Sequence, residues 1–280
     1  MGTQGTFNYR GGKSQLADWL IENTPRADFF VDPFGGSGAV SLSAVRSRKF
    51  GQILYNDKDA FIFTTLSVIR DNAGELCEFL RQTPIGRETV NLIYEWKNSG
   101  DPLKIAAGCI IQLEFTTYTP TLHNNEKNGW GRPHIRHINS ISRGVSSWLA
   151  RIENIRGMQN DLLQMALENR DWYDVAKRYT KFAPSQLKPK TPLHIIFLDP
   201  PYGETRGYNE DVPPEAVYNF FKEDHPYTYK MLCDVEGIDE LTGWEFVEFP
   251  HKQTSKKGLF LHGIYINDNS FRTKEPEGLF

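Results

Sequence analysis

The segment FFVDPFGGSGAVSLSAVRS, residues 29–47, decides the fold class. Residues 29–31 are a short apolar run typical of a buried strand, and residues 39–47 have the apolar spacing of a helix. The glycines between them permit a tight connection, so the segment predicts a strand, a turn and a helix. A second strand at 52–56, followed at once by Asp57, completes the βαβ half of a doubly wound sheet.

The remaining sequence extends this unit and interrupts it once. A length of 280 residues exceeds one minimal domain and falls short of two full ones, so we expect one α/β core with an insertion. Residues 73–115 have helical spacing, 116–143 have the composition of a loop or hairpin, and a helix resumes near 145–155. The alternating pattern then returns, with strands at 162–167, 193–198, 229–233, 246–249 and 259–266, and helices near 173–179 and 216–222. We therefore predict a catalytic domain made of 1–72 and 157–280, and a mostly helical insertion at 73–156.

Composition excludes membrane-spanning and disordered chains. The chain is 39% hydrophobic and 13% aromatic, and its longest apolar stretch, 105–113, is too short to cross a bilayer. No leader-like segment opens it, so we expect a soluble, cytoplasmic protein without a membrane partner. The three cysteines stand too far apart for a disulfide framework or a metal pair, which predicts buried thiols at Cys77, Cys109 and Cys233. A net charge of −3 argues against a histone-like polyanion binder.

The sharpest chemical signal is the tetrapeptide DPPY at 199–202, which directly follows the predicted strand 193–198. Ligands of open α/β sheets bind at that end of a strand. The two prolines have no N–H, so the backbone offers carbonyl acceptors beside the Asp199 carboxylate and the Tyr202 ring. Such a site suits an amino group on a flat ring, while the plainer alternative is an Asp-Pro turn that ends a strand.

The glycine turn at 34–38 favours a nucleoside cofactor without phosphates. It lacks the GxGxxG pattern of dinucleotide sites, and GGKS at 11–14 lacks the first glycine of a phosphate loop. The turn still allows a ligand to approach the backbone, with Asp32 immediately before it. Asp57, at the end of the second strand, is placed to accept both hydroxyls of a ribose.

Three motifs in this order, YRGGK at 9–13, DPFGGSG at 32–38 and DPPY at 199–202, resemble those of the α-class adenine-N6 DNA methyltransferases, the DNA adenine methylase family or D12 class. The resemblance implies a Rossmann-like mixed seven-stranded methyltransferase sheet with a target-recognition insertion. It also implies S-adenosylmethionine as cofactor and site-specific methylation of adenine N6 in double-stranded DNA, with the base flipped out of the duplex. By the same resemblance the cofactor would be bound by Tyr9, Lys13, Asp32, Phe34, Gly36, Gly38, Asp57, Asp171 and Trp172. For Asp171, capping of a helix is an equal alternative.

The chemistry of the amine predicts roles for the DPPY residues. The exocyclic nitrogen of adenine shares its lone pair with the ring and is a poor nucleophile. Asp199 and the carbonyl of Pro200 would each accept one N–H, which directs that lone pair towards the methyl group, and Tyr202 would stack on the base. The catalytic residues predicted are therefore Asp199, Pro200 and Tyr202.

DNA contact is expected in the insertion. Residues 113–156 hold six Lys or Arg against three Glu, an excess of positive charge in a chain of net charge −3. We predict base or phosphate contacts from Asn124, Lys127, Trp130, Arg132 and Arg136, with a solvated loop as the alternative. The histidines of this segment match no ligand spacing, so no metal is expected.

Other functions remain open at this point. Methylation of cytosine N4 usually goes with a serine in place of Asp199, and similar acceptors also serve amino-group methylation of RNA or protein. A non-catalytic DNA-binding subunit of a restriction or defence assembly is a third alternative. We expect a monomer that belongs to a restriction-modification system. Its expected partner there is a restriction endonuclease or another protein of a defence system.

Overall fold

The computed structural model describes most of the chain in eight segments. They are residues 13–84, 92–93, 95–115, 141–180, 192–201, 212–235, 237–250 and 262–268. Tyr9, Tyr202 and the five predicted DNA contacts, Asn124, Lys127, Trp130, Arg132 and Arg136, lie outside them.

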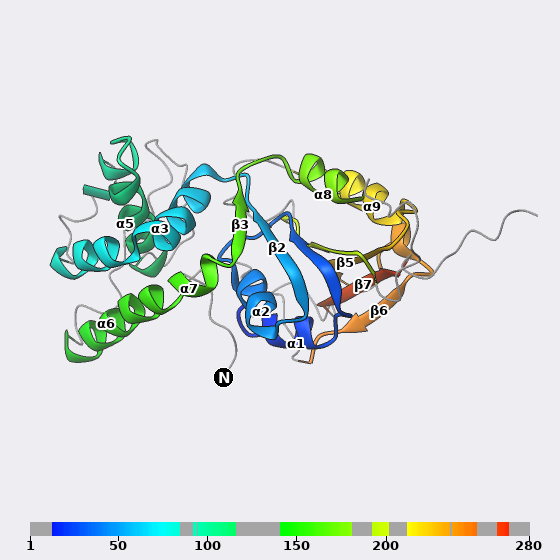
Figure 1. Ribbon diagram of the computed structural model, residues 1–280, viewed down its shortest axis with the longest axis horizontal. Coiled ribbons are helices and arrows are strands. Elements are labelled where there is room, and N and C mark those ends of the chain that lie inside the picture. Colours follow the sequence, from blue (N-terminus) through cyan, green and yellow to red (C-terminus); the bar gives the residue numbers. More distant parts are fainter. Residues whose placement is uncertain are drawn as a thin grey trace, which may run out of the picture.

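A seven-stranded sheet forms the centre of the molecule (Figure 1). Its order is β3-β2-β1-β4-β5-β7-β6, in which β7 runs antiparallel to both β5 and β6 and the other neighbours are parallel. The strands are β1 (Ala27–Asp32), β2 (Phe50–Asn56), β3 (Met165–Glu168), β4 (His194–Leu198), β5 (Thr228–Val235), β6 (Glu245–Glu248) and β7 (His262–Asp268). The predicted Rossmann-like mixed sheet of seven strands is confirmed.

Helices cover both faces of this sheet, because the parallel strands are apolar on both sides. One face packs Phe30, Ile53 and Phe197 against α1 (Ala17–Glu22) and α2 (Ala39–Ser47). The other packs Val31 and Ile196 against α8 (Trp172–Thr180) and α9 (Pro214–Lys222). Figure 1 shows these two pairs of helices on opposite sides of the strands. The molecule therefore has three layers, with the sheet between two layers of helices.

A helical lobe lies beside the β3 edge of the sheet (Figure 1). It consists of α3 (Ala60–Gln82), α5 (Pro102–Phe115), α6 (Ile141–Gly157) and the short α7 (Gln159–Leu162). Inside α3, Asn72 departs from helical geometry at φ −137° and ψ 36°, so the helix kinks at the predicted boundary of the insertion. Arg151 of α6 bridges Glu114 of α5 at 2.7 Å, with both side chains largely buried.

Most of the predicted elements are present, with bounds that differ from the predicted ones by a few residues. The helix predicted at 39–47 is α2, with the same bounds. The strand predicted at 162–167 begins at Met165, because Leu162 ends α7. The last strand begins at His262 within the described residues and ends at Asp268. All three cysteines are buried, as predicted.

Candidate functional site

The topology of the sheet creates one switch point between β1 and β4. From β1 the chain proceeds outward to β2 and β3, then returns to β4 on the other side of β1. In such sheets the connections leave in opposite directions, and a crevice opens at the carboxyl ends of the two strands. Asp32 ends β1 and Asp199 directly follows β4, and the register pairs Val31 with Ile196. Two carboxylates 167 positions apart in the sequence therefore meet at one edge.

The glycine turn places bare backbone at this crevice. Gly36 and Gly38 have φ of 50° and 73°, values that other residues rarely adopt, and Gly38 precedes the first residue of α2. The carbonyl of Gly36 accepts a hydrogen bond from the Tyr55 hydroxyl at 2.7 Å. At Gly35 the same Tyr55 ring occupies the space that a Cβ would need. The two glycines thus allow the left-handed turn that leads from the end of β1 into α2.

Asp32 is a buried carboxyl with one oxygen left without a partner in the described structure. Its side chain is 1% exposed. Oδ2 accepts a hydrogen bond from the Ser41 hydroxyl at 2.7 Å, whereas Oδ1 has no partner among the described residues. Burial raises the pKa of Asp32 to about 7, the Asp199 and Asp57 carboxylates raise it too, and the Ser41 hydrogen bond opposes them. A buried acceptor in this state suits a ligand that brings a positive charge or an N–H donor.

Asp57 is fixed by backbone donors from two sides. The amide of Gly36 donates to Oδ2 and the amide of Asp59 donates to Oδ1, each at 2.8 Å. Burial raises its pKa to about 7, and these amide hydrogen bonds act in the opposite direction. The carboxyl of Asp57 therefore bridges the glycine turn after β1 and the loop after β2, with lone pairs left for a ligand.

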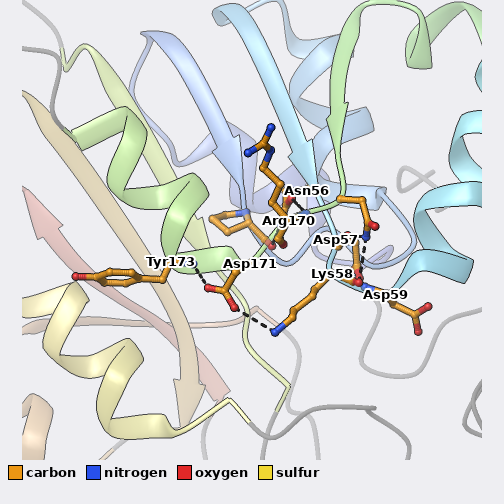
Figure 2. A network of polar contacts seen from close by, with 9 residues as sticks. Asn56, Asp57, Lys58, Asp59, Arg170, Asp171 and Tyr173 are labelled. Carbon is orange, nitrogen blue, oxygen red and sulfur yellow. Dashed lines mark hydrogen bonds and ion pairs between the residues drawn. The ribbon is translucent and has the colours of Figure 1, made fainter.

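Asn56, which the sequence analysis missed, ties three strand ends together (Figure 2). Its Nδ2 donates to the carbonyls of Pro33 at 2.9 Å and Arg170 at 3.1 Å. Its Oδ1 accepts the amide of Arg170 at 2.9 Å. Asn56 is fully buried, so these bonds lock the loops after β1, β2 and β3 in one arrangement. The sequence signal for it is a polar residue directly after the apolar run 53–55.

Asp171 and Trp172 border the same edge, and each also has a structural role. Asp171 Oδ1 accepts the amide of Tyr173 at 3.0 Å, which is the helix-capping contact named above as the alternative. Its Oδ2 faces Lys58 Nζ at 3.2 Å, as Figure 2 shows. Trp172 is 7% exposed and stacks on Phe34 with ring centroids 5.3 Å apart. Trp172, the first residue of α8, is therefore part of the hydrophobic core between α8 and the sheet. Phe34 packs against this core and begins the glycine turn.

At the end of β4, Asp199 binds Lys13. Lys13 Nζ lies 2.7 Å from Oδ1 and 2.8 Å from Oδ2, and the two side chains are only 10% and 15% exposed. Pro200, which follows, is buried. The structure thus brings together Lys13, Asp32, Phe34, Gly36, Gly38, Asp57, Asp199 and Pro200, with Asp171 and Trp172 at the border. Within the described residues, no group of three or more His, Cys, Asp or Glu side chains is placed to hold a metal ion.

This edge of the sheet thus combines a glycine turn with carboxyl groups at the ends of three neighbouring strands, β2, β1 and β4. Residues 9–95 match the model of the D12 class N6 adenine-specific DNA methyltransferase family. The D12 match includes Asp32, the glycine turn and Asp57, and it confirms the resemblance stated from the motifs. It supports an adenine-specific DNA methyltransferase and ends before Asp199.

Two further comparisons add little to the D12 match. A comparison with curated proteins gives no match. Among solved structures, the rRNA methyltransferase aviRa from Streptomyces viridochromogenes aligns over 92% of this chain and 86% of its own, with 13% sequence identity and a TM-score of 0.37. A similarity of that size carries no argument about function. Among the described helices, none has the length and hydropathy needed to cross a membrane.

Proposed function

We propose that this protein transfers a methyl group from S-adenosylmethionine to the N6 amine of an adenine flipped out of double-stranded DNA. The observation that carries the proposal is the meeting of Asp32 and Asp199 at the switch point, beside a glycine turn that belongs to the D12 match. The ends of β1 and β2 would hold the cofactor, and the end of β4 would hold the target base.

The residues of the β1 and β2 ends fit the cofactor. Asp32 Oδ1 is a buried acceptor without a protein partner in the described structure, which suits the cationic methionine end. Gly36 and Gly38 allow the left-handed turn between β1 and α2, and Asp57 would accept the ribose hydroxyls. Phe34, Asp171 and Trp172 would border the adenine ring. When bound, S-adenosylmethionine supplies an electrophilic methyl group on a sulfonium.

The residues after β4 would activate the target amine. Asp199 and the Pro200 carbonyl each accept one N–H, so the nitrogen lone pair turns out of the ring plane, and Tyr202 stacks on the base. The amine that Asp199 and Pro200 orient would then be placed to form a carbon–nitrogen bond to that methyl group, and the electron pair of the carbon–sulfur bond would leave with sulfur. The nitrogen finally releases one proton to water. No strong base is required, because the methylated ammonium is highly acidic.

The helical lobe would contact the DNA. We propose that residues 73–156 are the target-recognition insertion and that 1–72 and 157–280 form the catalytic domain. Base or phosphate contacts would come from Asn124, Lys127, Trp130, Arg132 and Arg136. Flipping is needed because adenine N6 cannot meet the methyl group in line while the base is stacked. We further propose that the protein acts as a cytoplasmic monomer and belongs to a restriction-modification or defence system.

A methylation map tests this function directly. The full chain is expressed in a methylation-free bacterial strain and modified bases are located genome-wide, with N6-methyladenine at one sequence motif as the expected result. Asp199→Ala should abolish the signal and still bind the cofactor. Asp28→Asn, an exposed residue of the same strand as Asp32, is the matched control and should keep it. Methylation at cytosine N4, or a blank map with methylated RNA, would contradict the proposal.

A further inference from the structure

Lys13 is held where its ammonium meets the Asp199 carboxylate. Its carbonyl accepts the amides of Leu16 at 2.8 Å and Ala17 at 2.7 Å, so its backbone is fixed at the start of α1. Leu16 and Ala17 are buried in the core beneath the sheet. The side chain of Lys13 then spans to a residue 186 positions away in the sequence, and it contacts both carboxylate oxygens. Long lysine side chains on exposed surfaces rarely keep such a contact, whereas this one is largely buried.

The surroundings of this ion pair are acidic. Asp32 lies close enough for the Asp199 charge to raise its pKa, and the buried Cys233 thiol is close enough for both charges of the pair to act on its pKa. Burial raises the pKa of Cys233 well above its usual range, Asp199 raises it further, and Lys13 opposes the rise. Lys13 therefore supplies positive charge where Asp199 and Asp32 would otherwise repel each other.

The geometry of the contact leaves Asp199 able to accept further hydrogen bonds. A carboxylate has about four lone-pair sites, two on each oxygen. Because Lys13 Nζ is almost equidistant from Oδ1 and Oδ2, it lies between them and uses the two inner sites. Among the described residues this leaves one outer site on each oxygen for an N–H donor. An ammonium that holds the carboxylate in this way fixes its orientation before a substrate arrives.

We propose that Lys13 is the positioning residue of Asp199, which it holds for the target amine, and that it is not a cofactor contact. The inference rests on the proposed methyl transfer. It replaces the cofactor role that the motif resemblance implied for Lys13. The cofactor would then be held by the ends of β1 and β2, and Lys13 would act on the chemical step through Asp199.

The test compares Lys13→Met, Lys13→Arg and the control Lys222→Met, which changes an exposed lysine at the end of α9. Each variant is measured for its single-turnover methylation rate at saturating DNA and cofactor, for its Kd for S-adenosylmethionine by calorimetry, and for its Tm. Lys13→Met should slow the chemical step roughly 100-fold, the effect of misplacing a catalytic group. Its cofactor Kd should stay within roughly threefold of the parent protein, because no cofactor contact is lost.

Lys13→Arg should recover at least roughly tenfold of that loss, because guanidinium also contacts both oxygens of a carboxylate. A weaker cofactor Kd with an unchanged saturated rate would overturn the proposal and return Lys13 to the cofactor site. Equal rates in Lys13→Met and the parent protein would overturn it too. A parent protein that methylates no nucleic acid would instead refute the proposed function, so the two failures are distinguishable.

Discussion

Affinity for S-adenosylmethionine should increase as the pH rises from 6 to 7. Burial raises the pKa of both Asp32 and Asp57 to about 7 in the free protein. A bound cation favours ionised Asp32, and ribose hydroxyls that donate to Asp57 favour its ionised form, so we expect binding to be coupled to the loss of both protons. With a pKa of about 7, roughly one-tenth of each group is ionised at pH 6 and half at pH 7. The affinity should therefore rise roughly fivefold for each carboxyl and roughly thirtyfold for the two together.

Calorimetric titrations with S-adenosylmethionine at pH 6.0, 6.5 and 7.0 measure this effect. The range ends at pH 7 because the α-amino group of the cofactor begins to lose its own proton above it. Titrations in two buffers of different ionisation enthalpy should show release of roughly 1.5 protons at pH 6.5. Asp32→Asn should bind more weakly at pH 7 and lose about fivefold of the pH dependence, whereas Asp28→Asn should behave like the parent protein. An affinity that is constant or falls over this range would refute the assignment of both carboxyls to the cofactor site.

Three further changes test the scaffold of the site. Gly35→Ala should destabilise the protein by about 2–3 kcal/mol in urea unfolding, because its methyl group would overlap the Tyr55 ring. Gly74→Ala, inside α3 with open space around it, should instead stabilise by about 0.5–1 kcal/mol. His194 is buried without hydrogen-bond partners among the described residues, and burial lowers its pKa to about 4. In the unfolded chain this histidine takes up its proton at a higher pH than in the folded protein. The free energy of unfolding should therefore fall by about 2 kcal/mol between pH 7 and 4.5. The variant His194→Phe should not show this fall. Asn56→Asp should lower Tm and weaken cofactor binding, because a carboxylate oxygen would face two carbonyl oxygens, and a normal Tm would contradict its locking role.

Local patterns were sufficient to predict the sheet. The strand at 29–31 and the helix at 39–47 are each determined mainly by residues close together in the sequence. The spacing of their apolar residues is therefore enough to predict them. The strand end after 198 was likewise predictable, because an apolar run stops there at two prolines. The positions of Asp32, Asp57 and Asp199 at strand ends could thus be predicted.

Contacts between distant segments could not be predicted in this way. The pairing of Lys13 with Asp199 depends on the return of the chain to β4 beside β1, and on the start of α1 being anchored below. No local pattern encodes that distance. Asn56 was missed for a related reason, since its partners Pro33 and Arg170 lie on two other strand ends. Asp171 also shows that a residue at a predicted ligand position can cap a helix as well.

The carboxyl groups at the strand ends fall into two groups according to their partners. Asp199 and Asp171 each face a lysine, at 2.7 Å and 3.2 Å. The donors that reach Asp32 and Asp57 in the described part of the chain are instead neutral, a hydroxyl and backbone amides. Neutral donors leave the negative charge of an ionised carboxylate uncompensated, and for that reason burial raises the pKa of these two groups. A cationic ligand at β1 and β2 would compensate that charge, while the compensated carboxylate after β4 suits a neutral amine, and so the same crevice can hold a sulfonium and an adenine side by side.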